Sequence, residues 1–113
     1  MRQRLPATRP GEIKKVEVGP VTLYITVNRD ANGAIREVFA KADEGQKPHA
    51  DGLAELSSLL LQYECPVKTV VQHLRYRRYP PAGIVNQPCS ISDAIGKVLE
   101  DEEAATEQMK AGK

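Results

Sequence analysis

The segment with the clearest chemical potential is a short run of arginines and tyrosines, His73-Leu-Arg-Tyr-Arg-Arg-Tyr-Pro80. Its three guanidinium groups can each donate paired hydrogen bonds to phosphate oxygens. Its two phenol rings offer faces on which a base can stack. Because the chain has only four tyrosines and one phenylalanine, this pairing predicts a binding site for a small nucleotide. The candidate residues are Arg75, Tyr76, Arg77, Arg78 and Tyr79.

The same run also has a purely structural interpretation. It follows an expected helix, so its arginines would complement the negative end of the helix dipole and remain in water. The two tyrosines would then cap the core. Both interpretations stay open at the level of the sequence.

Catalytic and metal-binding chemistry is poorly supported elsewhere in the chain. Neither His49 nor His73 is flanked by the residues of a catalytic triad. Cys65 and Cys89 form no CxxC or Cys/His pattern with metal spacing, and no glycine-rich phosphate loop is present. We therefore expect a non-catalytic protein with no metal and no cofactor, whose cysteines act as small hydrophobic residues.

Length and charge limit the remaining possibilities. A chain of 113 residues is the size of a single domain. No apolar run approaches the roughly 20 residues of a membrane span, and no signal-peptide pattern opens the chain, so we expect a cytoplasmic protein. The formal net charge is +1, and acidic residues crowd the C-terminus, which disfavours duplex DNA as a partner.

The first half of the chain has the pattern of an antiparallel sheet. We expect strands over residues 13–18, 21–28 and 35–41, and the second shows the clearest alternation of apolar and polar residues. The dipeptide Asn32-Gly33 indicates a tight turn between the second and the third. Three strands followed by helices predict an α+β fold, with three helices packed on one face of the sheet.

Three helices are expected in the second half. The first would bury Leu53, Leu56, Leu60 and Leu61, and the next two would bury stripes at helical spacing. Those stripes are Val67, Val70, Val71 and Leu74 in the second helix, and Ile91, Ile95, Val98 and Leu99 in the third. Ser90 and Asp93 form a start signal for the third helix, and residues 79–89 form an extended loop.

We expect a flexible basic arm over residues 1–12, a domain over residues 13–100 and an acidic, frayed tail over residues 101–113.

Several of these segments, in this order, resemble the TSCPD domain. That domain occurs at the C-terminus of adenosylcobalamin-dependent (class II) ribonucleotide reductases and also as free-standing small proteins. The resemblance spans roughly residues 9–100 and implies a fold and a place in nucleotide metabolism, but no active site. It rests on Leu23-Tyr-Ile-Thr-Val-Asn28, Arg36-Glu-Val-Phe39, Leu56-Ser-Ser-Leu-Leu-Leu-Gln-Tyr63, Pro66-Val-Lys-Thr-Val-Val71 and Ser90-Ile-Ser-Asp-Ala-Ile95.

The chain departs from this family at its cysteines. The family often has cysteines at positions that correspond here to residues 42–45, to Tyr79 and to Ile91. Cys89 lies two residues before the last of these positions. The resemblance therefore carries no redox or metal role over to this chain.

A second resemblance is one of architecture, to phage proteins of the anti-Thoeris sponge type. These join an N-terminal antiparallel sheet to C-terminal helices, form oligomers and bind cyclic signalling nucleotides. It implies a role for Tyr76 and for Asn86 near the junction of helix and loop. We therefore expect a homo-oligomer that binds a small nucleotide, with a cyclic signalling nucleotide as one form of the ligand. The alternative is an accessory module that docks on a ribonucleotide reductase subunit and binds no nucleotide.

Overall fold

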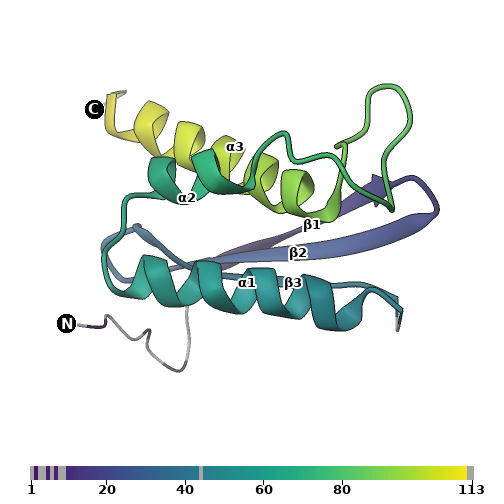
Figure 1. Ribbon diagram of the computed structural model, residues 1–113. Coiled ribbons are helices and arrows are strands. Elements are labelled where there is room, and N and C mark those ends of the chain that lie inside the picture. Colours follow the sequence, from purple (N-terminus) through teal and green to yellow (C-terminus); the bar gives the residue numbers. More distant parts are fainter. Residues whose placement is uncertain (1, 3–4, 6, 8–9, 44, 112–113) are drawn as a thin grey trace.

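The chain forms a three-stranded antiparallel sheet followed by three helices, in strand order β1-β2-β3 (Figure 1). The computed structural model describes residues 2, 5, 7, 10–43 and 45–111. This arrangement confirms the predicted α+β fold. None of the helices in these residues is long and apolar enough to cross a membrane. The elements are β1 (Gly11–Val18), β2 (Val21–Arg29), β3 (Ile35–Lys41), α1 (Lys47–Gln62), α2 (Val67–Leu74) and α3 (Ile91–Ala111).

The sheet follows the expected alternation. In β2, Leu23 and Ile25 are fully buried against the helices, while Tyr24 and Thr26 point to the opposite, open face. The turn before β3 is held by the carboxylate of Asp30, which accepts hydrogen bonds from the backbone N–H groups of residues 32 and 34. Gly33 adopts a φ of +84° there, a conformation that favours glycine.

Helices α2 and α3 bury the stripes that their spacing predicts, because every residue of both predicted stripes lies in the core. The start of α3 also agrees with the prediction: the Ser90 hydroxyl accepts a hydrogen bond of 3.1 Å from the backbone N–H of Asp93. Residues 75–90 contain no helix or strand, so the predicted loop between α2 and α3 is confirmed.

Helix α1 presents a different face to the core from the one expected. Leu61 is fully buried, but Leu56 and Leu60 are 63% and 49% exposed, so the prediction for these two leucines was wrong. Leu53 packs only partly against the core. The buried side of the helix is made of smaller residues, namely Ala50, Ala54, Ser57 and Ser58.

The reason is the edge of the sheet that α1 covers. β3 is an edge strand, and the backbone of Val38 directs its N–H and its C=O away from β2, where a buried polar group needs a partner. The Ser58 hydroxyl accepts from that N–H at 2.9 Å and donates to that C=O at 2.8 Å. Such contact requires a close approach that small side chains permit, so Leu56 and Leu60 face outward.

Helix α3 also extends beyond its predicted end. We expected fraying from residue 101, but α3 continues to Ala111. Arg29 of β2 contacts Glu102 at 3.1 Å and the hydroxyl of Thr106, and Lys14 lies 3.3 Å from the Glu102 carboxylate. Because Glu102 is buried, these ion pairs tie the acidic end of the helix to the sheet. β1 begins at Gly11, and half of the residues of the predicted basic arm lie outside the described residues.

We predict that Ser58→Ala destabilises the protein by about 1–3 kcal/mol, because it leaves both backbone groups of Val38 buried without partners. Leu56→Ala removes a larger but exposed side chain and is expected to cost less than about 1 kcal/mol. Urea unfolding of the two variants measures the difference. Equal losses would contradict the role given to the serine hydroxyl.

Candidate functional site

Loop 75–90, which carries the predicted binding residues, is anchored by Asp93 in the first turn of α3. One carboxylate oxygen of Asp93 accepts from the backbone N–H of Tyr76 at 2.8 Å, and the other accepts from that of Cys89 at 2.9 Å. The Arg75 guanidinium lies 3.1 Å from the same carboxylate. A single buried side chain therefore holds both ends of the loop.

These contacts determine the acidity of the groups around Asp93. Burial by itself raises the pKa of Asp93, but the hydrogen bonds from Tyr76 and Cys89 and the charge of Arg75 lower it below the ordinary aspartate value. Burial raises the pKa of the Cys89 thiol, and its hydrogen bond to Asp93 raises it further. This cysteine is therefore poorly suited to act as a thiolate nucleophile.

Arg75 and Tyr76 are brought together, but they contact each other. The Arg75 guanidinium lies 4.2 Å from the centre of the Tyr76 ring and donates to its hydroxyl at 2.8 Å. The Arg75 side chain is only 12% exposed and is also within 3.9 Å of Glu100. Its guanidinium is thus engaged within the fold.

Tyr79 points away from these two residues. Its hydroxyl lies 2.6 Å from His49 Nε2 in α1 and accepts a hydrogen bond of 3.1 Å from the backbone N–H of Ser92. Its ring meets the His49 ring edge-on, with centroids 5.2 Å apart. Tyr79 therefore joins the loop to the beginnings of two helices.

The other predicted site residues lie at the surface. Arg77 and Arg78 are exposed, although Arg77 donates to the carbonyl oxygen of His73 at 2.6 Å near the end of α2. Asn86 is exposed in a turn, with a φ of +69°. Tyr76 is 74% exposed. The groups available to a ligand on this loop are therefore Tyr76, Arg77, Arg78 and Asn86.

A second feature, an apolar groove of about 370 Å³, lies between α1 and α2. Leu56 and Leu60 form its α1 wall, while Val70 and His73 contribute from α2. Cys65, in the turn between the helices, also lines it and is half-buried. The sequence pattern signalled these leucines, but they were assigned to the core.

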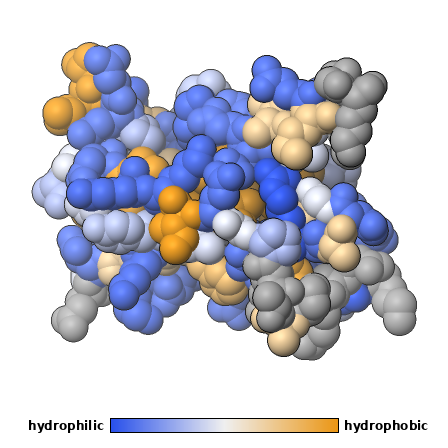
Figure 2. Space-filling model, turned by 180° about the vertical axis from the view of Figure 1, so that it is seen from behind, coloured by the Kyte–Doolittle hydropathy of each residue, from blue (hydrophilic) through white to orange (hydrophobic). Residues whose placement is uncertain are grey.

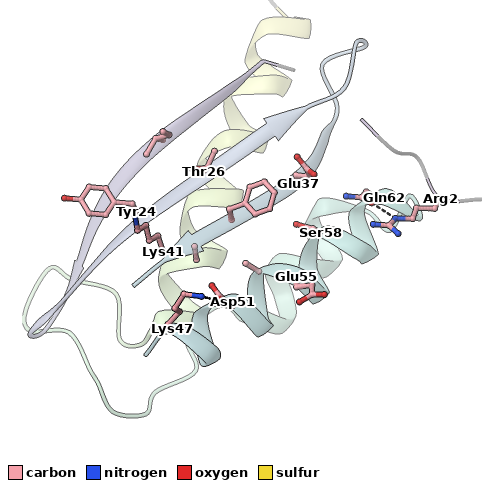
Figure 3. Close-up of a pocket in the computed structure, with 14 residues that line it drawn as sticks. Arg2, Tyr24, Thr26, Glu37, Lys41, Lys47, Asp51, Glu55, Ser58 and Gln62 are labelled. Carbon is pink, nitrogen blue, oxygen red and sulfur yellow. Dashed lines mark hydrogen bonds and ion pairs between the residues drawn. The ribbon is translucent and has the colours of Figure 1, made fainter. Parts of the chain in front are cut away.

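A third feature is a hollow of about 1010 Å³ between the open face of the sheet and α1 (Figure 3). Tyr24, Phe39 and Lys41 line it from the strands, and Lys47 and Glu55 line it from α1. Figure 2 shows the molecule from the side opposite to that of Figure 1, and apolar side chains reach the surface there among hydrophilic ones. No sequence pattern predicted this hollow, although the exposed positions of β2 and β3 follow from the period of two.

The described residues contain no group of three or more His, Cys, Asp or Glu side chains arranged to hold a metal ion. The three features offer different partners: cations on loop 75–90, an apolar surface in the groove, and aromatic rings beside lysines in the hollow.

The family model of the TSCPD domain matches residues 2–103. The chain belongs to the TSCPD domain family. This confirms the resemblance found in the sequence, and the domain has the three-stranded sheet and three helices described above. No solved structure gave a significant match.

The curated relatives of this TSCPD domain are much longer proteins. The vitamin B12-dependent ribonucleotide reductase of Streptantibioticus cattleyicolor is 33% identical over 91 residues, which are 78% of this chain and 15% of the reductase. The vitamin B12-dependent ribonucleotide reductase of Agrobacterium fabrum is 29% identical over 96 residues, which are 82% of this chain and 8% of that protein. The domain is thus related to a small part of each reductase.

We predict that Asp93→Asn destabilises the domain by about 1–3 kcal/mol at neutral pH, because the amide cannot accept every hydrogen bond that the carboxylate accepts. Since the folded pKa of Asp93 is lowered, its stabilising contribution is complete above the unfolded pKa of about 3.9 and is lost as the pH falls through the lower folded value. The stability difference between the two proteins should therefore shrink as the pH falls.

Urea unfolding of both proteins at several pH values between 5 and 2 measures this trend. Asp101→Asn is the control, because Asp101 forms an exposed pair with Lys97, and it should change stability by less than about 0.5 kcal/mol. A constant difference between wild type and Asp93→Asn across this pH range would contradict the prediction.

Proposed function

We propose that this TSCPD domain is a non-catalytic protein-interaction module that docks on a vitamin B12-dependent ribonucleotide reductase. The relatives support the choice of partner, because they carry the related segment within reductase chains. Within a reductase, such a segment would contact the rest of the chain through one of its surfaces. A separate module could bind a reductase through the same surface.

The observation that carries this proposal is the apolar groove between α1 and α2. Its α1 side exposes Leu56 and Leu60, and Tyr63, just after the helix, is 57% exposed. Contiguous apolar surface of this kind is typical of protein interaction sites. A groove between two helices suits the apolar side of a partner helix, which would insert its side chains between the leucines.

We predict that Leu56→Glu abolishes binding of the domain to the reductase of its own cell, because it places a charge in an apolar interface. Val85→Glu is the matched control: Val85 is 85% exposed on loop 75–90, outside the groove. Light scattering of the domain mixed with the purified reductase measures the complex.

Both substitutions are at exposed positions, and unfolding curves verify that each variant folds. Complex formation by the wild type and by Val85→Glu, with none by Leu56→Glu, is the expected outcome. If the wild type forms no complex, or if both variants bind equally, the docking proposal fails.

Nucleotide binding by loop 75–90 is a second candidate function, with the sequestration of a cyclic signalling nucleotide by a phage protein as one form of it. It is favoured by the exposure of Tyr76, Arg77 and Arg78 on one loop. Arg75 would support the loop through Asp93, and Asn86 lies exposed on the same loop.

Assembly as a homo-oligomer stays a prediction.

We predict that the combined change Arg77→Gln and Arg78→Gln weakens binding of a cyclic dinucleotide by about tenfold or more, because each charge-assisted hydrogen bond to phosphate is lost. Lys68→Gln, an exposed position on α2, is the control. Calorimetric titration with cyclic di-AMP measures both. Unchanged affinity in the double variant would exclude this loop as the site.

A further inference from the structure

The floor of the hollow has a regular order that the strand register determines. Thr26 pairs with Ile13 on one side and with Phe39 on the other. Tyr24 pairs in the same way with Lys15 and Lys41. Because cross-strand partners project from the same face, the open face carries a row in which a threonine stands between an isoleucine and a phenylalanine, next to a row in which a tyrosine stands between two lysines.

The aromatic rings of this face are available for contact. Tyr24 is 46% exposed and Phe39 is 51% exposed. Neither forms a ring contact or a side-chain hydrogen bond within the described part of the chain, in contrast to Tyr76 and Tyr79. Exposed aromatic faces on a sheet are surfaces on which bases stack in nucleic-acid-binding domains.

Two lysines lie at one end of the hollow. Lys41 and Lys47 lie at the same end as Tyr24, while Arg2 and Gln62 lie at the other (Figure 3). Lys47 pairs with Asp51 at 2.9 Å, but Lys41 has no ion-pair partner among the described residues. An anion that enters beside Tyr24 would thus meet the ammonium group of Lys41 directly and that of Lys47 next to it.

Acceptors lie on the same two elements as the lysines. Glu55 lines the hollow from α1, and Glu37 lines it from β3, where it accepts a hydrogen bond of 3.0 Å from Asn28. A ligand that fits all of these groups has an anionic end, a flat ring and hydrogen-bond donors. The volume of about 1010 Å³ is large enough for a complete small ligand.

We propose that the hollow between the open sheet face and α1 is a binding site for a mononucleotide. Its phosphate lies between Lys41 and Lys47, its base stacks on the surface formed by Tyr24 and Phe39, and its hydroxyl or amino groups donate to Glu55. This site shares no residue with loop 75–90 or with the groove, so it does not depend on either proposed function.

The test is calorimetric titration of the full chain with 5′-AMP, with adenosine and with inorganic phosphate. The combined change Lys41→Gln and Lys47→Gln should weaken AMP binding by about tenfold or more. Lys97→Gln is a matched control, because Lys97 forms the same i,i+4 pair, with Asp101 at 2.8 Å, on α3. It should leave the affinity for AMP unchanged.

The stacking surface is tested in the same way. Tyr24→Leu should weaken AMP binding by about fivefold or more, because a base loses its aromatic platform. Tyr63→Leu is the control: Tyr63 is similarly exposed, at 57%, but follows α1 outside the hollow. All five substituted positions are exposed, and unfolding curves establish that each variant is folded.

Three results would overturn the proposal. They are no heat with AMP at millimolar concentration, adenosine binding as tightly as AMP, and AMP affinity that the Lys41 and Lys47 changes leave intact. If the Arg77 and Arg78 variant loses AMP while the lysine variant keeps it, the nucleotide binds on loop 75–90 instead. If the docking proposal alone fails, AMP binding in the hollow is unaffected, so the two failures are distinguishable.

Discussion

The hydrogen bonds between the Ser58 hydroxyl and the backbone of Val38 determine how α1 lies against the sheet, and both surfaces of α1 follow from them. An edge strand leaves every second N–H and C=O without a strand partner, and Ser58 satisfies one such pair. The helix must come close to do so, which places alanine and serine on its inner side. Leu56 and Leu60 then line a groove with α2, and polar residues of α1 form one wall of the hollow.

Two buried carboxylates determine which cationic side chains are paired within the fold. Asp93 binds Arg75 and both ends of loop 75–90, while Glu102 binds Arg29 and Lys14. A buried carboxylate without such partners would carry a large desolvation cost. The fold therefore uses these cations to stabilise itself, and the cations left for a ligand are those, such as Lys41 and Arg78, that no described carboxylate pairs with.

The sequence predicted much of the fold because its local periods are strong. β2 alternates with a period of two, and α2 and α3 each carry one apolar stripe, so their buried faces had a single solution. Helix α1 has two candidate stripes at helical spacing: one contains Leu56 and Leu60, and the other contains Ala54 and Leu61. Hydrophobicity favours the first, whereas the need of Val38 for a hydrogen-bond partner selects the second.

The candidate sites likewise depend partly on local sequence and partly on contacts between distant residues. Residue types alone pointed to the arginines and tyrosines of residues 75–79, but the partners of Arg75 and Tyr79 are Asp93, His49 and Ser92, which lie 13 to 30 residues away in the chain. The sequence by itself determined the family, through several segments that occur in a characteristic order. It also determined the order of the elements and which faces of β2, α2 and α3 are buried, because these depend on local periodicity. Only the tertiary structure decided which cations remain available and which face of α1 is exposed, because both depend on buried polar groups that find partners far along the chain.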